Sequence, residues 1–235
     1  MTLVELFTSI AEAIRYKKES EEEISPTSFP AQIRSIEVSD LAYALISGTE
    51  TFSISNPDWT YVRPYAFANT CITSCDLPGI DYLEAFTLYD CPMLESVNLP
   101  NVEFMDEDAL SKCGRLKELY LPKCTTFMSG FDMMTYLEKF GVPNCEEDYL
   151  PAVMDARHLK LIDFRGRVDM NAIPTVYYTT GAAVGTLPKN LFGKCSVVVP
   201  DALYSDFESD SGWSAYFTNL PNMYELVKES EYVEE

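Results

Sequence analysis

The chain of 235 residues carries 37 Asp and Glu residues against 17 Lys and Arg residues, a formal net charge of −20. This excess of acid argues against nucleic acid and against an anionic membrane surface as partners, because both call for a basic protein surface. No apolar run approaches the roughly 20 residues that a membrane-spanning helix needs. Hydrophobic residues make up 47% of the chain, which is enough to build the core of one large domain or two small ones.

The set of residues suited to catalysis or metal binding is small. His158 is the single histidine, so any Ser-His-Asp or Cys-His catalyst would have to use it, and it falls at a predicted turn. The seven cysteines include no Cys-x-x-Cys pair and have no histidine nearby to complete a zinc site. We therefore expect no catalytic residue, no metal site and no cofactor, and we expect the protein not to be an enzyme.

The N-terminal residues favour two short helices. Residues 3–14 place their apolar side chains on one helical stripe, and residues 24–36 contain Ser and Thr residues suited to a helix cap. Residues 1–38 are therefore predicted to form a small helical module. The first residues lack the basic stretch, the long apolar run and the cleavage site of a signal peptide, so we expect no secretion by that route.

Residues 45–173 repeat themselves with a period of 21 to 23 residues. Leu77-Pro78, Leu99-Pro100 and Leu121-Pro122 are 22 residues apart, and Val142-Pro143 follows in step. Two further sets of apolar residues share the period: Phe67, Leu88, Leu110, Phe131 and Val153, and Ile80, Val102, Cys124 and Cys145. This period lies in the range of leucine-rich repeats and predicts an α/β repeat fold, a solenoid with one parallel β-sheet.

Within each repeat, a short strand alternates inward and outward side chains. Val97 and Leu99 are predicted to face the core while Asn98 faces out, because successive side chains of a strand point to opposite faces. The equivalent inward position is held by Cys75, Val97, Leu119, Phe140 and Ile162. Five cysteines occupy core positions of the repeat, so we expect buried free thiols rather than disulfides.

The outward strand positions, apart from Gly141, are the nine candidate binding residues. They form two files of neighbouring side chains: Asp76, Asn98, Tyr120, Gly141 and Asp163, and Ser74, Ser96, Glu118, Lys139 and Leu161. Repeat proteins present such files as extended binding surfaces, although an ordinary solvated sheet face is the alternative. Tyr120 and Leu161, exposed among polar residues, favour a contact surface. The three acidic members disfavour a negatively charged partner.

Two acidic clusters are weaker candidates. Asp206, Ser209, Asp210 and Ser211 carry oxygen ligands that suit Ca²⁺, but their spacing matches no EF-hand loop, so a solvated turn is favoured. Residues 106–108 and 146–148 could supply paired carboxylates for acid–base chemistry. They fall in turns with no apolar setting that would raise a pKa.

The period fails after residue 173, and residues 174–224 are predicted to form a cap of strands and helix. Val176–Tyr178 and Ser196–Val199 are expected to be strands, a helix is expected after Pro200, and Trp213 offers a bulky apolar plug. Such a cap covers the raw core and unpaired edge of the last coil. Residues 225–235, rich in glutamate, are predicted to be a mobile acidic tail.

The repeats resemble a known family. The segments at residues 66–78 and 91–100 are similar to the BspA-like leucine-rich repeat, written A-F-x-x-C-x-x-L-x-x-V-x-L-P. Residues 198–216 resemble the C-terminal cap, and residues 10–15 with 29–33 the N-terminal module, of such proteins from phages and prophages of Gram-positive bacteria. The resemblance implies a non-enzymatic binding or structural protein, made in the host cytoplasm and carried on the virion as a tail or head fibre or decoration.

The resemblance also implies partners. The N-terminal helices would attach to other virion proteins, and the solenoid would contact a protein or a cell-surface glycan of the host; an oligomer is possible. Bacterial BspA-like adhesins usually carry an export signal and a wall anchor, whose absence favours the phage interpretation. The alternative is an intracellular phage-encoded factor that binds a host protein.

Overall fold

The computed structural model describes residues 51–129, 131–146, 150–153, 155–167, 173–178 and 186–234. The helical module predicted for residues 1–38 and the loop predicted at residues 181–185 lie outside the described residues. The chain divides into two compact units, residues 1–50 and residues 51–235, and the second is described below.

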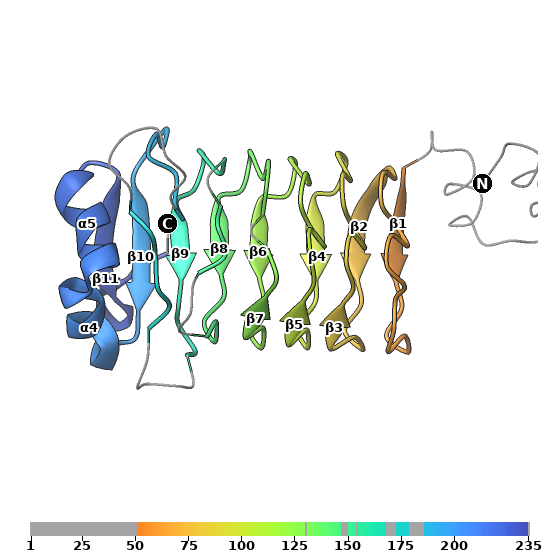
Figure 1. The fold of residues 1–235 in the computed structure, drawn as a ribbon, viewed down its shortest axis with the longest axis horizontal. Helices are drawn as coiled ribbons and strands as arrows, with labels where there is room; N and C mark the ends of the chain where they lie inside the picture. Colours follow the sequence, from red (N-terminus) through yellow and green to blue (C-terminus); the bar gives the residue numbers. More distant parts are fainter. Residues whose placement is uncertain are drawn as a thin grey trace, which may run out of the picture. The chain divides into compact units, whose positions relative to one another are not determined.

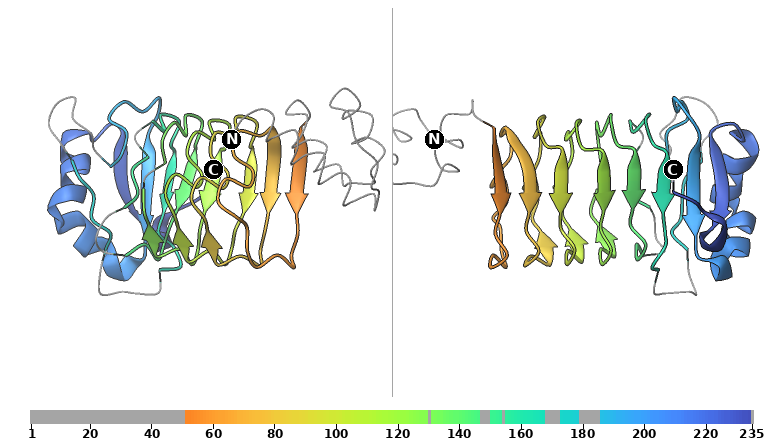
Figure 2. Two further views of the ribbon diagram at one scale, coloured as in Figure 1. Left: turned by 45° about the vertical axis from the view of Figure 1, so that its right-hand side comes forward. Right: turned by 180° about the vertical axis from the view of Figure 1, so that it is seen from behind.

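The second unit is a stack of short parallel strands that recur with the sequence repeat (Figure 1). Its strands are β1 (Phe52–Ser55), β2 (Ile72–Asp76), β4 (Ser96–Asn98), β6 (Glu118–Tyr120), β8 (Lys139–Gly141), β9 (Leu161–Asp163), β10 (Cys195–Val199) and β11 (Tyr224–Lys228). Seen from behind, the strands form the same continuous row (Figure 2).

The row is not the single hydrogen-bonded sheet that the sequence predicts. One ladder joins β1, β2 and β4, and a second joins β6, β8, β9, β10 and β11. Each of these strands has only three to five residues, so few hydrogen bonds join each pair of coils. The ladder is interrupted between β4 and β6, although these two strands stay in contact.

A second sheet lies beyond the proline corner of three coils. Its parallel strands are β3 (Tyr82–Leu83), β5 (Phe104–Met105) and β7 (Thr126–Phe127). The second residue of each strand is buried in the core, and the rings of Tyr82 and Phe104 stack with their centroids 4.7 Å apart. Strands of two residues are too short to show an alternating pattern, which is why the sequence did not reveal them.

The register places the repeat positions as predicted. Leu119 pairs with Phe140, and Phe140 with Ile162, so equivalent inward residues lie side by side. Cys75, Leu119, Phe140 and Ile162 are at most 1% exposed. Val97 is the exception, because it is only half-buried. The predicted inward-facing residues are thus confirmed as buried, except for Val97, which is partly exposed.

The proline corners are tied from coil to coil by asparagine side chains. Asn101 donates a hydrogen bond from Nδ2 to the carbonyl oxygen of Pro78 at 2.7 Å, and Asn144 does the same to Pro122 at 2.6 Å. Proline has no N–H to continue a strand, so the chain turns there. The following asparagine then satisfies the carbonyl at the corner of the preceding coil.

The turns that lead into the strands also follow the repeat. Positive φ angles occur at Tyr65, Phe86 and Asp108, and again at Asn69, Asp90, Lys112 and Met133. Within each series the residues are 21 or 22 positions apart, so each coil turns through the left-handed region at the same places. Side chains other than Gly, Asn and Asp adopt this region at a cost, which the packed stack must offset.

The cysteines are core residues, as expected. All seven are free thiols; six are buried and Cys71 is half-buried. Burial is the main cause that raises the pKa of Cys75, Cys124 and Cys145 to about 12. Their thiolate forms are therefore scarce at neutral pH.

Under native conditions at pH 8, we expect at most one of the seven thiols to react with Ellman's reagent within minutes. Cys71 is the candidate, since the other six are buried and reactivity needs an accessible thiolate. All seven should react after unfolding in guanidinium. Fast reaction of three or more thiols in the folded protein would contradict the burial of these side chains.

The C-terminal cap follows the last repeat. A helix is present after Pro200 as predicted, as the 3₁₀ turn Asp201–Leu203 followed by α4 (Tyr204–Ser209), and α5 (Ser211–Asn219) comes next. Asp210 caps α5 by accepting hydrogen bonds from the N–H groups of Gly212 and Trp213. Trp213 is fully buried and is the predicted plug.

Two expectations for the C-terminal part were wrong. Val176–Tyr178 forms no strand; Tyr177 instead exchanges hydrogen bonds with Thr186, which lies on a loop rather than on a strand that could extend the sheet. Residues 225–235 are not a free tail over most of their length. β11 spans Tyr224–Lys228 and pairs with β10. The buried Tyr224 anchors the strand, and the side chains of Lys194 and Ser196 both bind the carboxylate of Glu225.

Candidate functional site

The outward files lie in register across the strands. Glu118 pairs with Lys139 and Lys139 with Leu161, while Tyr120 pairs with Gly141 and Gly141 with Asp163. On the first ladder, Ser74 pairs with Ser96 and Asp76 with Asn98. The structure therefore brings the nine predicted residues into two groups, one on each ladder. Their role in binding stays a prediction.

The group on β2 and β4 is a ladder of polar side chains. Ser96 and Asn98 are exposed, and Ser74 and Asp76 are half-buried. Asp76 accepts hydrogen bonds from Ser55 at 2.9 Å and from Asn98 at 2.7 Å. These side chains satisfy one another along the stack, as expected for an ordinary solvated sheet face.

The group on β6, β8 and β9 surrounds a cavity of about 500 Å³, named here the β6–β9 groove. Among the residues lining it are Glu118, Tyr120, Lys139, Gly141, Leu161, Asp163, Arg165, Gly166, Glu229 and Glu234. Five of the nine predicted residues belong to this set. The groove thus gives this part of the outward face the shape of a binding site.

Tyr120 forms one wall of the groove because its neighbour is a glycine. Its ring lies across Gly141, where a Cβ atom would overlap the ring and lie 2.8 Å from Cε2. The Tyr120 hydroxyl donates a hydrogen bond to the carbonyl oxygen of Arg165 at 3.3 Å. The side chain is still 48% exposed, so a rigid aromatic surface faces solvent.

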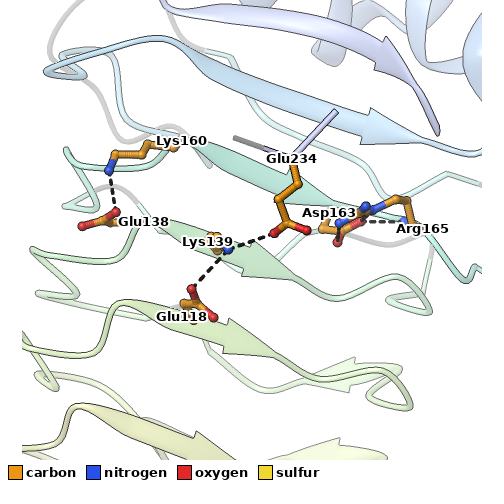
Figure 3. A network of polar contacts seen from close by, with 7 residues as sticks. All are labelled: Glu118, Glu138, Lys139, Lys160, Asp163, Arg165 and Glu234. Carbon is orange, nitrogen blue, oxygen red and sulfur yellow. Dashed lines mark hydrogen bonds and ion pairs between the residues drawn. The ribbon is translucent and has the colours of Figure 1, made fainter. Parts of the chain in front are cut away.

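Lys139 stands at the centre of the groove between two carboxylates (Figure 3). Its Nζ lies 2.9 Å from Oε1 of Glu234 and 3.3 Å from Oε1 of Glu118. The hydrogen bond that Lys139 donates to Glu234, followed by the one it donates to Glu118, raises the pKa of the Lys139 ammonium. The same contact lowers the pKa of the Glu234 carboxyl. Lys139 therefore stays charged throughout the neutral range.

Arg165 neutralises the acidic residue on β9. Asp163 accepts hydrogen bonds from Nε and Nη2 of Arg165 at 2.9 and 2.7 Å, and is only 9% exposed (Figure 3). The carboxylate also raises the pKa of the guanidinium. Bidentate pairs of this kind are geometrically specific. The groove walls therefore carry two cations among four carboxylates, so the acidic surface that the sequence suggests is partly neutralised.

Leu161 is not the exposed contact residue that the sequence predicts. It is 4% exposed, since Lys139 and Ser196 flank it in register and the chain after β11 lies over this part of the sheet. Leu161 and Glu234 line both the groove and a neighbouring cavity of about 570 Å³, to which Tyr232 and Val233 also contribute.

Arg165 and the C-terminal residues Glu229 and Glu234 line the groove but were not predicted from the sequence. Arg165 lies two residues after Asp163, so strand alternation puts both on one side, which was an available signal. Glu234 and Lys139 are 95 positions apart in the sequence, so no local sequence pattern predicts their contact.

Other candidates have structural roles. His158 is half-buried between the rings of Tyr136 and Phe192, with centroid distances of 5.1 and 4.9 Å. Asp210 caps α5 instead of binding calcium. Asp106 and Asp108 accept hydrogen bonds from Tyr82 and Ser111. In the described part of the chain, no group of three or more His, Cys, Asp or Glu side chains is placed to hold a metal ion.

Replacing Gly141 by alanine tests the fit with Tyr120. We expect the free energy of unfolding to fall by about 1 kcal/mol, because the new methyl group displaces the ring. In a Tyr120→Ala background the same change should cost at most about half as much, since the ring is gone and only the carbonyl oxygen of Asp163, 3.3 Å from the new Cβ, stays close. Urea unfolding of the four proteins of this cycle measures both effects. Equal losses in both backgrounds would contradict the contact.

The comparisons with known proteins give one match. The family described as "BspA type Leucine rich repeat region (6 copies)" matches residues 14–140, just over half of the chain. Neither the curated proteins nor the solved structures provide a match. The strand β9, with its Leu161, Ile162 and Asp163, lies beyond the matched range but continues the register of the repeat. Within the described residues, no helix is long and apolar enough to cross a membrane.

Proposed function

The chain belongs to the BspA-type leucine-rich-repeat family, and on that premise we propose that it binds a partner protein through the β6–β9 groove. Leucine-rich repeats generally mediate protein–protein interaction, and the family is typically non-enzymatic. The observation that carries the proposal is the exposed Tyr120 ring, fixed over Gly141 beside the cations Lys139 and Arg165. Aromatic and arginine side chains dominate the energy of protein interfaces.

The choice of this groove rests on what surrounds it. On the described part of the outward face, the neighbouring strands β2 and β4 carry small polar side chains that bond to one another. The groove combines an aromatic wall, fixed charges of both signs and a cavity of about 500 Å³. These are the properties of a specific binding surface rather than of a solvated sheet.

The test is quantitative capture with three versions of the full chain as bait. Tyr120→Ala should reduce capture of the partner at least about tenfold if Tyr120 is a hot spot of the interface. Met128→Ala is the matched control, because Met128 is also a large exposed residue but lies beyond β7, outside the groove. Equal loss with both variants, or no loss with either, would count against the groove.

The biological setting that we propose is a phage virion. The support is the resemblance of the N-terminal and C-terminal segments to those of phage and prophage repeat proteins. The N-terminal module would attach to other virion proteins while the groove contacts the host surface or another virion protein. Mass spectrometry of purified particles tests this; absence of the chain from the particles would refute it.

The alternative is an intracellular phage-encoded factor that binds a host protein. Seven free cysteines, six of them buried, suit a chain that folds under reducing conditions. The capture experiment separates the two settings, because the virion role predicts tail or capsid proteins and the alternative predicts a soluble host protein. Retention on a glycan array, dependent on Tyr120, would instead identify a host glycan as the ligand.

A further inference from the structure

The residues after β11 place the C-terminal segment, Tyr232–Glu234, on the candidate face. Tyr232 has an extended backbone, with φ −78° and ψ 130°. In an extended chain, alternate side chains point to the same side. Tyr232 and Glu234 accordingly face the sheet, while Val233 between them is 79% exposed. The segment thus presents one carboxylate to the groove and one aromatic ring to the neighbouring cavity.

Each of these two side chains meets one cation of the outward face. The guanidinium carbon of Arg165 lies 5.1 Å from the centre of the Tyr232 ring, and Nζ of Lys139 lies 2.9 Å from Oε1 of Glu234. The cations have fixed positions, because Asp163 holds Arg165 and Glu118 holds the other side of Lys139. The spacing of the pair therefore selects an aromatic residue and an acid two positions apart.

The same contacts are weak enough to be exchanged. The Lys139 and Glu234 side chains are 42% and 56% exposed, and solvent screens an ion pair of this kind. The tether to β11 supplies a high effective concentration, which is what keeps such weak contacts formed. A free peptide with an aromatic residue and an acid two positions apart would contact the same Arg165 and Lys139 side chains, but without the tether.

We propose that the face around Lys139 and Arg165 is a peptide site for an extended segment with an aromatic residue followed two positions later by Glu or Asp, and that Tyr232–Glu234 occupies it in cis. The inference rests on the proposed function and names the partner's chemistry. A partner segment would have to displace the chain's own segment. The net charge of −20 disfavoured acidic partners, but the two fixed cations provide a local site for one.

The experiment measures binding of a fluorescein-labelled peptide, Glu-Ser-Glu-Tyr-Val-Glu-Glu, which copies residues 229–235. The hosts are the full chain and a full-length variant with Tyr232→Ala and Glu234→Gln, named the opened variant. Fluorescence anisotropy in low salt should show at least about tenfold tighter binding to the opened variant, because the internal competitor is gone. A peptide with Ala for Tyr and Gln for the following Glu should lose this binding.

A matched pair of lysine changes locates the site. Lys139→Gln in the opened variant should weaken binding at least about fivefold, by loss of the ion pair with the peptide. Lys123→Gln is the control with the same change of charge, since Lys123 bonds to Asn101 and does not line the groove. Equal effects of the two changes would overturn the proposal.

Three further outcomes would overturn it. The first is equal affinity of the peptide for the unmodified chain and the opened variant. The second is no binding to an opened variant whose circular dichroism and melting temperature match those of the unmodified chain. The third is self-association of the unmodified chain that the opened variant lacks, because the segment would then occupy the groove of a second copy.

A second measurement covers an opened variant that fails to fold. With 3-fluorotyrosine at position 232 of the otherwise unmodified chain, saturating unlabelled peptide should shift the fluorine resonance toward its position in a Lys139→Gln variant. An unchanged resonance would overturn occupancy in cis. The two proposals can fail separately: capture that depends on Tyr120 without any peptide binding would leave the proposed function standing and remove only this inference.

Discussion

Replacing Trp213 by alanine is expected to lower the free energy of unfolding by about 3–5 kcal/mol. Trp213 is fully buried, and its Nε1 donates a hydrogen bond to the carbonyl oxygen of Pro174 at 2.8 Å. Its ring packs against Phe164 and Phe207, with centroids 5.7 and 5.1 Å away. The variant therefore loses apolar contacts on two sides, leaves a cavity, and leaves a buried carbonyl without its donor.

The loss should be concentrated at the C-terminal end of the stack. Coils of a repeat protein contact mainly their neighbours, so stability is approximately a sum of local terms. Phe164 directly follows β9, which makes it the link between the repeats and the cap. Hydrogen exchange followed by mass spectrometry should show faster exchange in β9 and β10, with β2 little changed.

Phe217→Ala is the control for this prediction. Phe217 stacks on Trp213 at a centroid distance of 6.3 Å but is only half-buried. Its removal should cost about 1–2 kcal/mol, because less apolar area leaves water on folding at this position. Equal losses from the two changes, or uniform exchange along the stack, would contradict the role of Trp213 as the plug of the last coil.

The repeat and its register could be predicted because every coil has to bury the same positions. A strand of three residues leaves one side chain inward, so Leu119, Phe140 and Ile162 had to align once the coils stacked. The cap could be predicted in part, since the last coil needs a cover and Trp213 was the bulkiest residue at hand.

The strand β11 could not be predicted because its signals conflict. Glutamates surround it and favour solvent, yet Tyr224 is buried and its hydroxyl donates a hydrogen bond to the carbonyl oxygen of Pro188 at 2.6 Å. Lys194, 31 residues earlier, pairs with Glu225. Contacts over such distances decide the structure here, whereas a charge count over a short window cannot register them.

The sequence predicted where the candidate site lies but not how its charges are paired. The outward files led to Tyr120 and Lys139, which line the groove. The pairing of charges was missed, because Arg165 falls outside the strand and Glu234 is 95 residues from Lys139. The surface stays acidic in sum, but its two cations are each held by a carboxylate.

Replacing Phe140 by alanine should destabilise the protein by about 3–5 kcal/mol. Phe140 is fully buried in β8, and its ring meets that of Phe131 edge to face at 5.7 Å. β8 lies between β6 and β9, so the cavity would weaken contacts in both directions along the stack. Urea unfolding measures the loss.

Val97→Ala is the companion change at the equivalent position of another coil. Val97 is only half-buried, so we expect a loss of about 1 kcal/mol or less from the methyl groups removed. The two side chains hold the same repeat position but differ in size and burial. Their strands differ too, because the ladder is interrupted beside β4 and continuous on both sides of β8. If Val97→Ala costs as much as Phe140→Ala, repeat position alone determines stability. If the losses differ as expected, the size and burial of the side chain in each coil determine its contribution to stability.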